Sequence, residues 1–182
     1  MKMESLRDLY LEQLQDLYNA EQQLIKALPK MAKAASSREL KSAIQDHLEE
    51  TKGHAQRIET ICEQMGESPK GKKCKGMEGL IKEGSETAGE DFEDGLMDAA
   101  IIADAQRVEH YEIAGYGCVH AYATRLGEEQ AADLLAQTLA EEKAADKKLN
   151  DIGEQLNLQL GREAGEAQKP AVKSSRSSRR AA

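Results

Sequence analysis

The chain has 182 residues, which is enough for one domain with a substantial core. Its 40% hydrophobic and 32% charged residues are typical of soluble proteins, and 3% aromatic residues with no Trp argue against a core built from β-sheets. The chain has no apolar segment near the roughly 20 residues that span a bilayer, and its N-terminus, MKMESLRDLY, lacks the apolar region of a signal peptide. We therefore expect a cytoplasmic protein without a membrane partner. Its three Cys residues form no CxxC pair, which favours reduced thiols over a disulfide framework or a zinc site.

Residues 4–35 predict the first helix, because core residues recur alternately three and four positions apart. This core stripe consists of Leu14, Leu17, Glu21, Leu24, Leu28, Met31 and Ala35. Glu21 therefore occupies a core position, where a carboxylate needs a partner. Pro29 must kink this helix or end its regular part early, since it removes a backbone hydrogen bond.

Residues 37–65 predict a second helix, antiparallel to the first because the intervening turn is short. Ser36 and Glu39 have the spacing of a capping box, and Gly66 provides the stop. The inward face of this helix carries two imidazoles beside a carboxylate: His47, His54 and Glu50.

Residues 66–76 predict a loop, and residues 77–88 a short helix that crosses the end of the bundle. A helix over residues 93–126 repeats the core stripe of the first helix at an offset of 91 positions, which places Glu112 where the first helix has Glu21. Glu109 lies one turn before Glu112 and therefore on a similar face. The last helix covers residues 128–158 after a stop at Gly127; Glu142 is in its core stripe, flanked by Glu141 and Asp146.

The offset of 91 also relates the hydrophobic residues of the second and last helices, which indicates a duplicated helical hairpin. Two hairpins that share a heptad pattern by chance are the alternative. Two short turns and one long connection predict an all-α fold: a ferritin-like four-helix bundle of two antiparallel hairpins, joined by a crossover with a short extra helix. We assign residues 1–160 to this bundle and residues 161–182 to a disordered basic C-terminal tail.

Charge is distributed unevenly between the bundle and the tail. The net charge is -8, and residues 168–182 hold five basic and no acidic residues, so residues 1–167 carry -8 minus 5, or -13. Such a basic arm is able to attract nucleic acid. We favour a solvated tail that aids solubility over a nucleic-acid-binding one.

Acidic side chains on all four long helices predict a dinuclear metal site in mid-bundle. Unpaired carboxylates in a dry core would each cost several kcal/mol, against a total stability of about 5 to 15 kcal/mol. Two divalent cations would balance four carboxylates, and Fe or Mn suits oxygen ligands with an occasional imidazole. The alternative is that each glutamate reaches solvent or pairs with Lys or Arg, and that His47 or His54 simply pairs with Glu50.

Several runs of sequence resemble the YciF-like bacterial stress proteins, a ferritin-like family without a defined biochemical role. They are YNAEQQLIKALPKMA, HLEETKGH, CKGMEGLIKEG, DAQRVEHYEIAGYG and AEEKAADKKL, and together they extend from about residue 4 to residue 157. The resemblance implies a bundle of the rubrerythrin or bacterioferritin type, two Fe (or Mn) ions per chain, a homodimer, and production during stress.

The resemblance also implies a set of metal ligands. The core acids would be Glu21, Glu50, Glu112 and Glu142, with His54 and Asp146 as additional ligands four residues after their glutamates. This choice relates the second and last helices by an offset of 92 rather than 91, which keeps Glu141 open as a substitute for Glu142. His47 and Glu109 complete the candidate ligands.

The sequence departs from ordinary di-iron proteins because none of its four His residues follows a Glu by three positions. A site made mostly of carboxylates puts efficient redox cycling in doubt, so metal binding is better supported than catalysis. The first hypothesis is a stress-associated protein that binds two Fe or Mn ions and oxidises Fe(II) or removes peroxide. The second is a metal-free scaffolding bundle that acts through dimerisation and its basic tail.

Overall fold

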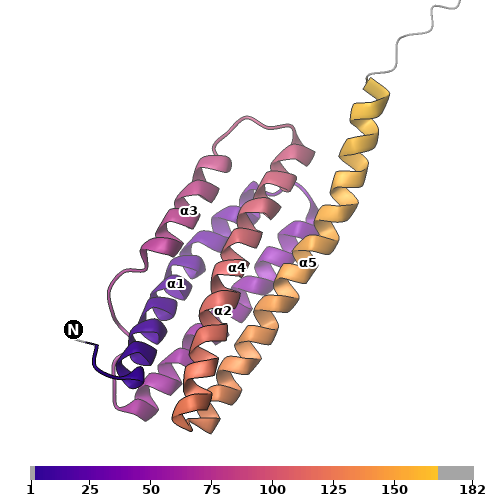
Figure 1. Cartoon of the computed structure of the whole chain (residues 1–182). Coiled ribbons are helices and arrows are strands. Elements are labelled where there is room, and N and C mark those ends of the chain that lie inside the picture. The colour runs from indigo at the N-terminus through magenta and orange to yellow at the C-terminus, as the bar shows by residue number, and fades with distance from the viewer. Residues whose placement is uncertain (1–2, 168–182) are drawn as a thin grey trace, which may run out of the picture.

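The computed structural model describes residues 3–167, except for the side chains of residues 94 and 163–167, and contains five helices and no strand within that range (Figure 1). The helices are α1 (Leu6–Ala34), α2 (Arg38–Met65), α3 (Lys75–Thr87), α4 (Asp94–Leu126) and α5 (Glu129–Ala167). The prediction of an all-helical chain is confirmed.

The helix ends follow local capping chemistry. Ser5 caps α1 in a capping box with Asp8. The Ser5 side chain accepts a hydrogen bond from the backbone N–H of Asp8, and the Asp8 side chain accepts one from the backbone N–H of Ser5. Gly66 and Gly127 end α2 and α4 in the left-handed conformation, each with φ of 74°, as their sequence positions predict. Helix α1 continues past Pro29 to Ala34, so the proline does not end it.

Helix α5 is longer than the sequence predicts. It continues to Ala167 rather than ending near residue 158, so residues 161–167 of the predicted tail are helical. Figure 1 shows that the C-terminal part of α5 projects beyond the other helices. The rest of the predicted tail, residues 168–182, lies outside the described residues.

The four long helices lie side by side as two hairpins. Helices α1 and α2 pack against each other, as do α4 and α5, and further contacts join α1 to α4 and α2 to α5. The chain between α2 and α4 returns along the outside of these helices (Figure 1).

Helix α3 occupies this return path, and its predicted position is wrong. It packs along the sides of α1 and α4 and does not cross the end of the bundle (Figure 1). Met77 is fully buried there, and Leu80 and Ile81 pack against the same apolar cluster. The sequence shows the apolar face of this helix but not the surface that covers it.

The predicted capping box at the start of α2 is also wrong by one residue. Ser37 is the N-cap, and its Oγ accepts a hydrogen bond from the backbone N–H of Leu40. Ser36 instead binds Asp98 of α4: its backbone N–H and its Oγ donate to the two carboxylate oxygens at 2.7 Å, and the N–H of Ser37 donates at 2.8 Å. This buried carboxylate ties the turn of the first hairpin to the second hairpin.

A layer of polar side chains interrupts the apolar core about halfway along the long helices. One apolar cluster contains Leu24, Leu28 and the residues around α3, and the other contains Tyr10, Leu14 and Leu17. The buried polar side chains between them, called the polar layer below, are Glu21, His47, Thr51, His54, Glu109, Glu112, Thr138 and Glu142.

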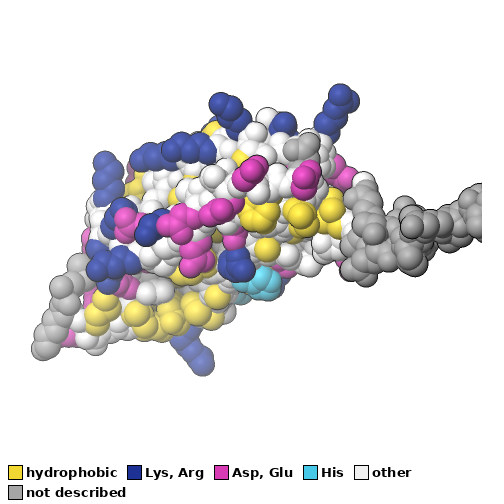
Figure 2. Space-filling model, turned by 90° about the horizontal axis from the view of Figure 1, so that it is seen from above, with side chains coloured by type: hydrophobic (Ala, Val, Ile, Leu, Met, Phe, Trp, Pro, Cys, Tyr) yellow, Lys and Arg dark blue, Asp and Glu magenta, His cyan; other side chains and the backbone are white. Residues whose placement is uncertain are grey.

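The surface carries mixed charge. Figure 2 shows acidic and basic side chains interspersed over one face, with hydrophobic side chains in groups between them. None of the helices in the described range is long and apolar enough to cross a membrane.

Candidate metal centre

The polar layer contains two groups of three potential metal ligands. The first triad consists of Glu21 from α1, His54 from α2 and Glu142 from α5; the second consists of His47 from α2, Glu109 from α4 and again Glu142. Within each triad, one ligand atom per residue lies within 4.8 Å of the others.

In the first triad, the Nδ1 atom of His54 is the common neighbour. It lies 2.9 Å from Oε1 of Glu142 and 3.7 Å from Oε1 of Glu21. All three side chains are fully buried.

In the second triad, the Nε2 atom of His47 lies 3.4 Å from Oε1 of Glu109 and 4.0 Å from Oε2 of Glu142. Glu142 therefore turns one carboxylate oxygen toward each histidine. A carboxylate in this position is suited to bridge two ions.

Glu112 of α4 belongs to the same centre although it is in neither triad. It is fully buried, and neither of its oxygens has a hydrogen-bond partner. Besides burial, the negative charges of Glu21, Glu142 and Glu109 raise the pKa of Glu112. Glu112 is therefore near members of both triads. Glu112 thus supplies the fourth buried carboxylate.

The four carboxylates are held in unfavourable electrostatic surroundings. Burial raises the pKa of Glu21 to about 7, and the charge of Glu142 adds to this effect. Burial likewise raises the pKa of Glu109 and of Glu112 well above the usual range. Among the described residues, no Lys or Arg forms an ion pair with Glu21, Glu109, Glu112 or Glu142.

The histidines counter part of this charge. Burial alone would lower the pKa of His47, but the charges of Glu109 and the other acidic neighbours together outweigh burial, and the pKa rises to about 10. The pKa of His54 is raised in the same way, because its close contact with Glu142 and the negative charges of Glu142 and Glu21 together outweigh burial. The pKa of Glu109 is likewise raised, because burial outweighs the charge of His47 beside it.

A hydrogen-bond network outside the triads orients His54. Its Nε2 lies 3.0 Å from Oε2 of Glu141, and Arg57 holds both oxygens of Glu141 at 2.6 and 3.0 Å. Arg57 also donates to Oγ1 of Thr138 at 2.9 Å. A carboxylate that accepts from the outer nitrogen of a histidine fixes the tautomer in which the other nitrogen is free to bind a metal. Glu141, kept open as a ligand by sequence, therefore lies on the outer side of His54.

Tyr116 of α4 contacts the centre from the apolar cluster that contains Tyr10, Leu14 and Leu17. Its fully buried hydroxyl donates a hydrogen bond to Oε1 of Glu21. Burial and the charge of Glu21 raise the pKa of this phenol far above its usual value, so it stays a hydrogen-bond donor. Tyr116 is one of several tyrosines at core spacing in the sequence, so helical spacing alone does not identify it as the residue that contacts Glu21.

Besides Glu112, two other residues predicted as ligands, Glu50 and Asp146, lie outside the triads. The side chain of Glu50 is 45% exposed, and its Oε2 atom lies 3.6 Å from Nδ1 of His47 in the polar layer. Asp146 faces the surface between α4 and α5, where it accepts from Gln106 at 3.3 Å and lies 3.6 Å from His110.

Burial follows the offset of 91 rather than 92. Glu21 and Glu112 are equivalent buried positions at this offset, as are Thr51 and Glu142. The position equivalent to His54 is Ala145 rather than Asp146. The two halves thus share a backbone pattern but contribute different ligands.

The residues of this centre fit a pair of divalent cations. Metal ligands about 2.1 Å from one ion lie at most about 4.2 Å apart, which is close to the separations within each triad. Buried atoms without hydrogen-bond partners occur on all six side chains: Glu21, His47, His54, Glu109, Glu112 and Glu142. Each such atom is costly in a dry core, and a bound cation would satisfy it.

Comparisons with known proteins point to one family. Residues 5–160 match the family described as "Domain of unknown function (DUF892)". The chain is 46% identical over 153 residues to the protein YciF of Escherichia coli K12, covering 84% of this chain and 92% of YciF.

Solved structures agree with this match. The crystal structure of the E. coli stress protein YciF superimposes with a TM-score of 0.82 at 44% identity, covering 85% of this chain and 98% of YciF. The structure of YcfI from Rhodopseudomonas palustris, suggested to be a structural protein, gives 0.79 at 46% identity, with 82% and 95% of the two chains covered. A protein of Xanthomonas campestris pv. campestris, at 22% identity and a TM-score of 0.69, shares the fold, with 88% of this chain and 99% of that chain covered.

Proposed function

The chain belongs to the DUF892 family and is a relative of the stress protein YciF, and we propose that it is a ferritin-like four-helix bundle that binds two Fe or Mn ions in its polar layer. The two hairpins, with a long return between α2 and α4, support the ferritin-like arrangement. We also propose that the protein forms a homodimer.

The observation that carries this proposal is the position of Glu142 between two triads. Its two oxygens face His54 and His47, which belong to opposite sides of the centre. A structural ion pair would need one partner for this carboxylate, whereas a dinuclear site needs a carboxylate that faces two ions.

The two metal positions would have different surroundings. The first position would have Glu21 and His54, with Tyr116 and Glu141 as hydrogen-bonding groups behind them. The second would have His47 and Glu109 and would lie nearer to solvent, since His47 contacts the exposed Glu50.

Bound Fe or Mn would supply one-electron chemistry toward dioxygen or peroxide. The protein would balance the ionic charge with four carboxylates and hold His54 in one tautomer through Glu141. The surrounding apolar clusters would keep bulk water out of the layer and thereby strengthen its electrostatic interactions.

Metal content of purified variants tests the proposal. We expect about two ions per chain in the wild type, about one in Glu21→Ala and in Glu109→Ala, and none in Glu142→Ala, because Glu142 belongs to both triads. Asp146→Ala is the matched control, since Asp146 lies outside both triads, and it should keep two ions. Equal metal content in Glu142→Ala and the wild type would contradict the proposal.

A metal-free scaffolding role is the second candidate, favoured by the structural role suggested for the R. palustris relative. It predicts that the wild type takes up no ion after reconstitution and that the protein acts through its surface. Deletion of residues 168–182 should then abolish its function, whereas the metal proposal predicts unchanged metal content.

A further inference from the structure

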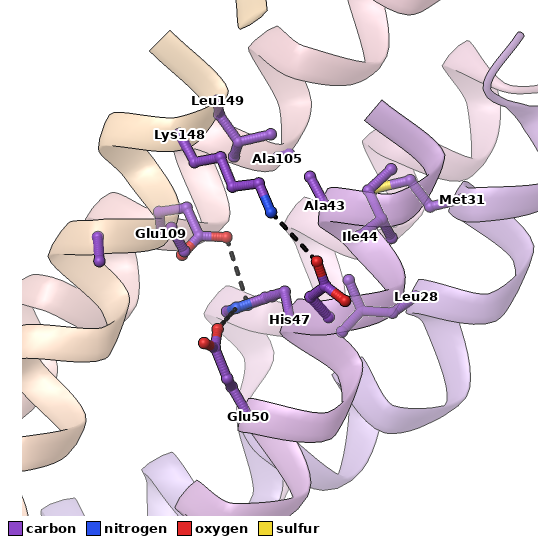
Figure 3. Close-up of a pocket in the computed structure, with 13 residues that line it drawn as sticks. Leu28, Met31, Ala43, Ile44, His47, Glu50, Ala105, Glu109, Lys148 and Leu149 are labelled. Carbon is purple, nitrogen blue, oxygen red and sulfur yellow. Dashed lines mark hydrogen bonds and ion pairs between the residues drawn. The ribbon is translucent and has the colours of Figure 1, made fainter. Parts of the chain in front are cut away.

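We infer that the pocket beside His47 binds a short alkyl molecule that ends in a hydroxyl group; its chemical role, though not its binding, rests on the proposed metal centre. The pocket has a volume of about 110 Å³ and is lined by residues of α1, α2, α4 and α5 (Figure 3). Its lining includes His47 and Glu109 of the second triad, so a small molecule in the pocket would contact that triad.

One wall of the pocket is polar, and the other walls are mainly apolar. Figure 3 shows His47, Glu50 and Glu109 together on one side. The other walls are apolar side chains from four helices, namely Leu28, Met31, Ala43, Ile44, Ala105, Ala144, Ala145 and Leu149. An occupant must therefore be amphipathic, with its polar group toward His47.

The volume limits the occupant to a few non-hydrogen atoms. A buried apolar cavity of about 150 Å³ holds benzene. A pocket of about 110 Å³ is smaller and suits a chain of about four carbons. A hydrated metal ion would not fill the apolar part of the pocket, because the side chains there offer no groups to replace its water.

The polar wall selects a neutral hydroxyl as the end group. Both ring nitrogens of His47 and the Oε2 atom of Glu109 are buried and make no hydrogen bond. The acceptors beside the two nitrogens are Oε1 of Glu109, 3.4 Å from Nε2, and Oε2 of Glu50, 3.6 Å from Nδ1. A hydroxyl both donates and accepts, so it can satisfy a carboxylate and an imidazole N–H together. A carboxylate end group would instead meet Glu50 and Glu109, and an ammonium group would lose its hydration.

The entrance lies beside an exposed ion pair. The Nζ atom of Lys148 donates to Oδ2 of Asp46 at 3.1 Å, and the two side chains are 49% and 63% exposed. Both line the pocket and join α5 to α2. An exposed pair of this kind opens at little cost, about 0 to 1 kcal/mol.

A hydroxyl on the polar wall would lie next to the second metal position, because His47 and Glu109 belong to both the wall and the second triad. Catalytic metal sites keep such a position open for substrate. Alcohols and alkyl hydroperoxides share the terminal hydroxyl, so both are candidate sources.

Methyl NMR of chelator-treated protein labelled at alanine measures this binding directly. Ala43, Ala105, Ala144 and Ala145 line the pocket and report on it. Titration with linear alcohols should give saturable shifts at these methyl groups, with affinity rising about fourfold per methylene from ethanol to 1-butanol. The gain should stop beyond about five carbons, when the pocket is full. Shifts that never saturate, or affinity that keeps rising with chain length, would overturn the inference.

An isomer and two variants test the two walls separately. Diethyl ether has the same atoms as 1-butanol but cannot donate, so it should bind at least tenfold more weakly; equal binding would refute the role of Glu109. Ala145→Phe and Ala43→Leu should fill the pocket and abolish the shifts, whereas Ala140→Phe, on an exposed site of α5, should not. Unchanged binding in both filling variants that keep the helical spectrum would also overturn the inference.

The source of the hydroxyl is distinguished with tert-butyl hydroperoxide and tert-butyl alcohol, which have the same apolar body. Tighter binding of the peroxide assigns the pocket to hydroperoxides, and tighter binding of the alcohol assigns it to alcohols; binding of neither, together with no 1-butanol binding, would reject the hydroxyl. Because no metal is present in these titrations, their failure is distinguishable from a failure of metal uptake.

Discussion

The metal-free protein should lose stability as the pH rises above the ordinary pKa of a glutamate. Burial raises the pKa of Glu21 from 4.5 to about 7, so the folded chain holds a proton that the unfolded chain has already released. A difference of about 2.5 between the two pKa values corresponds to about 3 to 4 kcal/mol, at about 1.4 kcal/mol for each unit. The stabilisation is complete below pH 4.5 and is lost as the pH rises through about 7.

Other groups of the centre act in the same direction. The pKa of Glu109 and of Glu112 is also raised, and the acidic groups around His47, Glu109 foremost, raise the pKa of His47 to about 10. The stabilisation from His47 is complete below its ordinary value of 6.5 and is lost toward pH 10. Glu141 acts in the opposite direction, because hydrogen bonds, chiefly from Arg57, lower its pKa despite burial. Its stabilisation is present above pH 4.5 and is lost only as the pH falls below that value.

Urea unfolding of the chelator-treated protein between pH 5 and 8 measures this loss. We expect the free energy of unfolding to fall by about 3 kcal/mol or more from pH 5 to 8, and Glu21→Gln to remove most of Glu21's share. Excess Fe(II) or Mn(II) should reverse the trend, because the ions displace these protons. A constant or rising stability of the metal-free protein over this range would refute the electrostatic description of the centre.

Two further substitutions probe the surroundings of the centre. Asp98→Ala should lower the free energy of unfolding by about 2 to 4 kcal/mol, since it leaves Ser36 and Ser37 without an acceptor, and a smaller loss in urea titration would contradict this role. Arg57→Ala should weaken metal binding about 10- to 100-fold in a competition titration while leaving the stoichiometry at two, because Glu141 would no longer be held against His54; unchanged affinity would show that Arg57 does not act through His54.

Helical periodicity alone predicted the most important feature of the core. The stripe through Glu21, repeated 91 residues later at Glu112, placed two carboxylates inside the protein, and both are fully buried. This prediction worked because a residue in a stripe of leucines has no other face to occupy.

Side-chain direction on the second and last helices was harder to predict. Glu141 and Glu142 are neighbours in sequence, and the rotation of α5 decides which one faces inward. That rotation depends on packing against α2 and α4, which the pattern of α5 does not contain. The same limitation explains why Asp146, one turn after Glu142, lies at the surface beside Gln106.

Contacts between distant segments accounted for the remaining differences. The cap of α2 shifted to Ser37 because Asp98, about 60 residues away, binds Ser36. Helix α3 was recognised by its apolar face, but its place on α1 and α4 depends on the surface that those helices present. Arg57 had no signal of its own, since its role depends on Glu141 of another helix.

Anomalous diffraction from crystals of the full chain loaded with Fe(II) would test the dinuclear centre most directly. We expect two peaks about 3.5 to 4 Å apart on either side of Glu142, one beside Glu21 and His54 and the other beside His47 and Glu109. An anomalous map without peaks in the polar layer, from protein reconstituted with excess metal, would contradict this expectation.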